Sequence, residues 1–261
     1  MPTLRYEEFA VDAALRPWLL NYWRFSVGAH GPDAAPHTVW PDGCTSIALL
    51  ATPSPGPRIF CTGPRVTAMQ PPLRPHSVMW GLRLWPDCSA AVLGLAAGQL
   101  RDRTGPADPS IATWAAPLLE ACDAREAAPV VSAFDALLRP RQPAWSQPDA
   151  AVRRALRFIT AQRGDVAMAT VASEAGLGLR QLQRRFAQLT GVTLRDWARI
   201  RRLRESIALR LQHEGGWSAI AAETGFADHA HLTREFRALV GLAPSHVAER
   251  LDAIEHRNVR P

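Results

Sequence analysis

Two ten-residue stretches, LQRRFAQLTG at residues 182–191 and LTREFRALVG at residues 232–241, share one pattern fifty positions apart. Leucine, arginine, phenylalanine, leucine and glycine occupy the first, third, fifth, eighth and tenth places of both. On a helix of 3.6 residues per turn, Leu182, Phe186 and Leu189 lie on one face while Arg184 points away. Glycine after such a segment marks the end of a helix. Each stretch is therefore predicted to be an amphipathic helix with an outward arginine.

The residues before each stretch also match. Ala172 and Gly176 stand four positions apart before the first, and Ala221 and Gly225 do the same before the second. A short helix, a tight turn with glycine and a second helix with outward polar residues make up a helix-turn-helix motif. The sequence thus predicts two such motifs in one chain.

Residues 150–250 resemble the DNA-binding domain of the AraC/XylS-type transcription regulators, most clearly in IAAETGFADHAHLTREFRALVGLAPS at 220–245. The aromatic residue after the turn glycine is present as Phe226, and the closing Gly-x-x-Pro as Gly241 and Pro244. The segment HAH at 229–231 departs from the pattern, because many members carry other polar residues there. The resemblance implies two motifs joined by a long helix, with double-stranded DNA and RNA polymerase as partners.

Periodicity and capping residues give the helices of this half. Asp149 is a good N-cap for the first of them, Ser218 is expected to cap the fifth, and Asp228 the sixth. The expected helices span residues 150–162, 169–175, 179–190, 194–213, 219–224 and 229–240.

Several outward side chains suit base recognition, because arginine can pair with guanine and glutamine with adenine in the major groove. In the first recognition helix these are Arg180, Gln183 and Arg184, and the resemblance implies base contacts for the same three. For the second helix the resemblance implies the candidates His229, Ala230, His231 and Arg234. Thr233, Arg237, Ser218 and Asp228 are expected near the DNA phosphates or their neighbours. Arg199, on the connecting helix, is expected to add to binding without selecting a sequence.

The net charge of the two halves supports DNA binding by the C-terminal half. Residues 1–149 hold 12 Arg and 13 Asp plus Glu, a net charge of −1, whereas residues 150–261 hold 18 and 11, a net charge of +7. The basic excess lies where a polyanion would be bound.

The N-terminal half has the pattern of short strands followed by helices. Residues 15–27 fit either a helix or the start of a strand, and residues 37–52 predict a hairpin around Pro-Asp-Gly. Strands are expected at residues 58–62, 67–70 and 77–85, and about three helices within 90–100 and 111–138, with breaks at Pro117 and Pro129. The predicted fold class is α+β, with a small antiparallel barrel or sandwich before an all-α domain.

These patterns divide the chain into a regulatory domain at 1–140, a proline-rich linker at 141–149, the DNA-binding domain at 150–250 and a tail at 251–261. LRPWLLNYW, WPDGCTS and WGLRLWP give the first domain a weaker resemblance to uncharacterised sensor-like domains that precede AraC-type domains. That resemblance implies a regulatory module, and the apolar helices of 111–138 suggest a homodimer. An aromatic pocket for a small-molecule effector is one interpretation of Trp40, Asp42, Trp80, Arg83 and Trp85, and plain core packing is the other.

Two other classes of function stay open. A small-molecule enzyme or metal-binding barrel with a DNA-binding appendage would need a clustered ligand set, and His30, His37, His76, Cys44, Cys61 and Cys88 lack close ligand-like spacing. Arginine-driven binding of any nucleic acid is the second alternative. We expect no enzyme activity, no cofactor and reduced core thiols. The sequence lacks a signal pattern and a membrane-length apolar run, so a cytoplasmic protein without membrane contact is expected.

Overall fold

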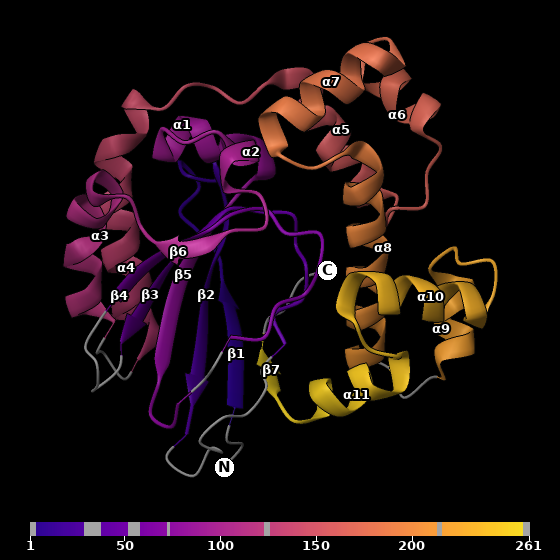
Figure 1. Cartoon of the computed structure of the whole chain (residues 1–261). Coiled ribbons are helices and arrows are strands. Elements are labelled where there is room, and N and C mark those ends of the chain that lie inside the picture. Colours follow the sequence, from indigo (N-terminus) through magenta and orange to yellow (C-terminus); the bar gives the residue numbers. More distant parts are fainter. Residues whose placement is uncertain are drawn as a thin grey trace.

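The computed structural model describes residues 4–28, 38–51, 58–71, 74–122, 126–212 and 216–257. Over these ranges the chain is an α+β protein, as predicted, with a β-sheet and its covering helices in the N-terminal half and helices in the C-terminal half (Figure 1).

The sheet has seven strands in the described ranges, in the order β6-β4-β3-β5-β2-β1-β7. Neighbouring strands run antiparallel, except that β7 lies parallel to β1. The ladder is open between β6 and β7 within these ranges, so the expected barrel or sandwich takes the form of one open sheet. The strands are β1 (Leu4–Phe9), β2 (Leu19–Val27), β3 (Ser46–Ala51), β4 (Arg58–Thr62), β5 (Val78–Leu84), β6 (Thr104–Pro106) and β7 (Glu255–Arg257).

Part of the predicted strand pattern is wrong. The expected hairpin of residues 37–52 does not form among the described residues, because β3 pairs with β4 and β5 while Val39 bridges to Met69. That bridge is all that the structure shows of the strand expected at 67–70. For residues 15–27 the strand alternative holds from Leu19 onward, whereas the strands at 58–62 and 77–85 are confirmed as β4 and β5.

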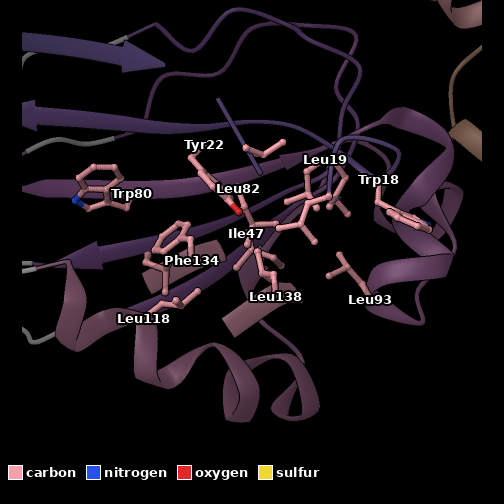
Figure 2. Packing of buried hydrophobic residues seen from close by; sticks show 14 of the residues in the cluster. Trp18, Leu19, Tyr22, Ile47, Trp80, Leu82, Leu93, Leu118, Phe134 and Leu138 are labelled. Carbon is pink, nitrogen blue, oxygen red and sulfur yellow. The ribbon is translucent and has the colours of Figure 1, made fainter. Parts of the chain in front are cut away.

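Helices cover one face of the sheet and bury its aromatic residues (Figure 2). Trp80 and Leu82 of β5 are fully buried there with Phe134. Tyr22 meets Phe134 edge to face at 5.0 Å between ring centroids and donates its hydroxyl to Asp135 over 2.8 Å. The elements on this side and at the sheet end are η1 (Pro86–Cys88), α1 (Ser89–Leu93), α2 (Ala97–Leu100), α3 (Pro109–Ala121), α4 (Ala127–Leu138) and η2 (Arg139–Ala144).

Two proline-containing segments differ from expectation. Pro117 lies inside α3 on its exposed side, so it interrupts one hydrogen bond without breaking the helix. The segment predicted as a linker begins within η2, and Trp145 packs against Trp18, whose indole N–H donates to the Ser146 carbonyl over 2.9 Å. This connection is therefore packed against the N-terminal half.

The C-terminal helices follow the predicted order. α7 and α10 have the predicted bounds, and Asp149 and Asp228 cap α5 and α10 as expected. Ser218 was wrongly predicted as a cap, because α9 already begins at Trp217 after Gly216. The helices are α5 (Ala150–Ala161), α6 (Met168–Ala175), α7 (Leu179–Thr190), α8 (Leu194–Gln212), α9 (Trp217–Glu223), α10 (His229–Val240) and α11 (Pro244–Asp252).

All four cysteines are buried and free, which confirms the prediction of core thiols. Burial raises the pKa of Cys61 to about 11, so this thiol stays protonated at neutral pH. No helix in the described ranges combines the length and apolar character that membrane crossing requires.

Candidate nucleic-acid interface

The first motif is built from α6 and α7. Gly176 ends α6 in the left-handed region, with φ of +70°, and its N–H bonds to the Ala172 and Ser173 carbonyls. α7 begins three residues later, and its Leu182 and Phe186 are fully buried against α5 and α8. Hydrophobic burial therefore fixes which side of α7 faces outward.

The outward side of α7 carries the predicted base readers. Arg180, Gln183 and Arg184 are all exposed, and Arg180 and Arg184 stand one helical turn apart. Among the described residues neither of these two arginines forms an ion pair, whereas the neighbouring Arg185 is paired with the Asp149 cap. The structure therefore leaves two guanidinium groups available beside one amide.

The second motif repeats this arrangement in α9 and α10. Leu232 and Phe236 are fully buried, while Arg234 and Arg237 are exposed on the outer side, without an ion pair in the described ranges. His229 and Ala230 at the start of α10 are exposed as well.

His231 and Thr233 differ from the other candidates, because both are half-buried. The His231 ring meets Phe226 edge to face at 5.3 Å, and its Nδ1 accepts a bond from the Ala227 N–H over 3.4 Å. The Oγ1 atom of Thr233 is buried and has no hydrogen-bond partner among the described residues. The residues grouped on the outer side of α10 are thus His229, Ala230, Arg234 and Arg237.

Ion pairs and hydrogen bonds tie neighbouring segments of this half to α8. Arg199 of α8 bonds through Nε to Glu235 of α10 over 2.7 Å, and a second contact measures 3.3 Å. Arg202 donates to the Gly164 carbonyl over 3.0 Å, and Arg163 reaches Glu205 over 3.2 Å.

The loop after α5 also packs closely on α8. Gly164 has φ of +80°, and a Cβ atom placed there would lie 2.1 Å from the Ala198 carbonyl oxygen. The loop after α5 and the helix α10 are therefore both held against α8 by direct contacts.

A family model described as a helix-turn-helix domain matches residues 171–250, which hold both motifs from within α6 to within α11. The C-terminal half contains an AraC-type helix-turn-helix domain. The resemblance inferred from the repeated pattern is thereby confirmed. The C-terminal half accordingly carries a helix-turn-helix domain of the kind found in DNA-binding transcription regulators.

Solved structures show further similarity. ToxT from Vibrio cholerae O395 has 10% sequence identity and a TM-score of 0.48, covering 96% of this chain and 99% of that one. A probable AraC family transcriptional regulator from Rhodopseudomonas palustris CGA009 has 23% identity and a TM-score of 0.36, over 40% of this chain and 98% of that one. The DNA-binding domain of AdpA, solved with a target DNA, has 21% identity and a TM-score of 0.38, over 40% and 96%. No curated protein sequence gives a significant match.

The five predicted effector residues lie in several different environments of the structure. Asp42 and Arg83 form an ion pair of 2.8 Å, in which Arg83 also reaches Glu8 over 3.0 Å. Trp80 is fully buried beneath α4, and Trp40 packs against the core of the second motif. The structure brings together Asp42 and Arg83 and places Trp80 in the core.

Trp85 belongs to the contact between the two halves of the molecule. Arg153 of α5 lies 4.6 Å above its ring and bonds to both oxygens of Asp87 in η1, over 2.7 and 3.2 Å. The Asp87 side chain is fully buried in this pair. Trp85 thus serves as packing beside a buried ion pair.

The N-terminal half also contacts both motifs of the AraC-type domain. Arg101 donates to the Gly191 carbonyl at the end of α7 over 3.2 Å, and the Ala68 N–H donates to the Leu239 carbonyl of α10 over 2.7 Å. These contacts link the N-terminal half to the C-terminal ends of α7 and α10.

Sequence reasoning missed the groups that form these contacts. Glu235, Asp87 and Arg153 were not singled out, because each pairs with a residue at least 36 positions away. In the sequence these residues are distinguished only by their charge, and many other residues of this chain are charged as well. In the described ranges no group of three or more His, Cys, Asp and Glu side chains is placed to hold a metal ion; His30 and His37 lie outside those ranges.

Proposed function

We propose that α7 and α10 enter successive major grooves on one face of B-DNA and read an asymmetric site. Recognition helices held about one helical turn apart, roughly 34 Å, serve this purpose in helix-turn-helix proteins. The observation that carries the proposal is the repeated outward set of arginines, Arg184 and Arg234, on two helices of one chain. Both guanidinium groups are exposed and outside any ion pair in the described ranges.

The division of roles within this interface follows from chemistry. Arg180, Arg184 and Arg234 suit guanine, and Gln183 suits adenine, because their donors and acceptors match those base edges in the major groove. Arg237, in the last turn of α10, suits a phosphate. We assign His229, Ala230 and His231 to the edge of the second reading surface, with Thr233 and the Asp228 cap at its margin. The Asp228 cap fixes the start of α10.

The N-terminal half is proposed to regulate this binding. It contacts the ends of both reading helices, through Arg101 at Gly191 and through Ala68 at Leu239, so a shift within it would alter their relative position. A small-molecule effector or homodimerisation through this half would supply that shift, and RNA polymerase is the expected partner of the DNA-bound protein.

Selection from a random duplex library, followed by fluorescence anisotropy over a salt series, tests the proposal. Wild type should prefer the selected duplex over a scrambled one by a hundredfold or more. Arg184→Ala and Arg234→Ala should each lose about 1–3 kcal/mol of binding free energy on the selected duplex and relax the choice of one base pair.

Arg195→Ala provides the matched control, since Arg195 is exposed at the start of α8 and lies outside both reading helices. It should weaken the selected and scrambled duplexes equally and leave the preference intact. Equal affinity of wild type for the two duplexes would contradict the proposed function and favour sequence-independent binding.

A further inference from the structure

We infer that Leu179, the first residue of α7, is a specificity-determining residue that contacts the C5-methyl group of a thymine. The inference rests on the proposed function, because it places α7 in a major groove. It adds an apolar contact to the polar base readers of that helix.

The exposure of Leu179 is unusual in this chain. Its side chain is 36% exposed, and it is the one large hydrophobic residue classed as exposed within the described ranges. It follows directly on Gly178, where an added Cβ would meet nothing within 4 Å. An exposed leucine beside open space leaves apolar surface that a bound partner can cover.

The position of Leu179 places that surface at the reading side. Leu179 and Gln183 are four residues apart and so lie one above the other on the helix, next to the column formed by Arg180 and Arg184. A groove that admits Gln183 and Arg180 therefore also receives Leu179.

The chemistry of the groove decides what Leu179 contacts there. Base edges in the major groove present hydrogen-bond donors and acceptors, and the thymine methyl is the apolar group among them. A leucine placed over any other edge would cover polar atoms without bonding to them, which costs free energy. Leu179 consequently favours thymine and disfavours the other bases at one position.

The second motif shows that a leucine here is not required to build the fold. The core positions Leu182 and Phe186 recur as Leu232 and Phe236, but the position matching Leu179 holds His229, which is also exposed. The buried residues repeat while this outer residue changes, as expected for a residue that sets what each helix reads.

Replacing thymine by deoxyuridine removes only the methyl group and so tests the contact directly. In the selected duplex, each thymine of the half-site read by α7 is exchanged in turn, and affinity is measured for wild type and Leu179→Ala. We expect one exchange to weaken wild type about fourfold, as for loss of one buried methyl group. Leu179→Ala should bind the thymine and deoxyuridine duplexes alike.

Two controls keep the test decisive. Alanine is a strong helix former, so Leu179→Ala should retain the melting temperature and the scrambled-duplex affinity of wild type. His229→Ala, at the matching position, should retain the full deoxyuridine effect.

The inference is overturned if no thymine shows the effect in wild type, or if the effect persists in Leu179→Ala. In both cases a preserved preference for the selected duplex leaves the proposed function standing. If wild type shows no such preference, the proposed function fails and the inference fails with it.

Discussion

Arg199 is a residue of α8 whose side chain binds α10, one of the two helices predicted to contact DNA. Its guanidinium binds both oxygens of Glu235, which lies on α10 beside Arg234 and Phe236. Because this ion pair ties α10 to α8, we expect Arg199 to act on recognition by orienting α10, in addition to the uniform contribution that the sequence predicts.

We predict that Arg199→Met and Glu235→Gln each lower the preference for selected over scrambled DNA by about two- to fivefold, as for loss of a partly exposed ion pair. The two variants change net charge in opposite directions, so a purely electrostatic effect would move overall affinity in opposite directions. Anisotropy on both duplexes separates these cases. The double variant should lose no more preference than either single one, and additive losses would argue against the pairing.

Among the elements, β7 is a short strand that carries one histidine, and we expect the protonation of this histidine to affect the stability of the strand. His256 of β7 lies opposite Tyr6 of β1, with 6.3 Å between ring centroids. Burial lowers the pKa of His256 below its usual value of about 6.5. Detached, the strand binds a proton more readily than when paired, so its stability rises with pH and is lost as the pH falls below about 6.5.

We predict that the β7 amides exchange hydrogen faster at pH 5.5 than at pH 7.5, after correction for the intrinsic chemical rate. His256→Phe keeps an aromatic ring without the titrating group and should remove this dependence. Hydrogen exchange followed by mass spectrometry measures these rates in wild type and in His256→Phe. An unchanged pH dependence in His256→Phe would assign it to another group.

The elements also show what sequence alone can determine. α7 and α10 were predicted at their full length, because apolar spacing and glycine ends are local signals. β6 and β7 were not predicted, since short edge strands depend on partners far along the chain, and β1 was not predicted either. The hairpin at 37–52 failed for the same reason, because Val39 finds its partner in Met69.

In the candidate site too, local signals were predictable from the sequence and tertiary contacts were not. Arg180, Gln183 and Arg184 could be placed on the outer face of α7 from periodicity. His231 could not be placed, since its contact with Phe226 depends on the turn. The proposed pocket residues Trp40 and Trp80 packed into two different cores, which only the tertiary structure distinguishes.

At the scale of the whole molecule, the buried pair of Asp87 and Arg153 joins the two halves. Arg153 also donates to the Pro17 carbonyl over 2.6 Å, so its guanidinium group has hydrogen-bond partners in addition to the Asp87 carboxylate. Removing one partner would leave the other charge buried without compensation.

We predict that Asp87→Ala lowers the free energy of unfolding of the whole chain by about 3–5 kcal/mol, measured by urea denaturation. Asp252→Ala is the matched control, because its pair with Arg210 is exposed on the Asp252 side and should be worth at most about 1 kcal/mol. Equal effects of the two changes would show that the buried pair does not hold the halves together.

The pairing of β7 with β1 also has a consequence for biosynthesis. Arg5 lies opposite Glu255 in this ladder, so β1 gains this neighbour only after 250 further residues have been synthesised. Strands so far apart in the chain pair slowly, because the entropy of closing the long loop between them is lost before their contacts stabilise the fold. During translation the outer side of β1 therefore stays uncovered until the DNA-binding half has emerged, and unpaired strand edges of this kind are where nascent chains associate with one another.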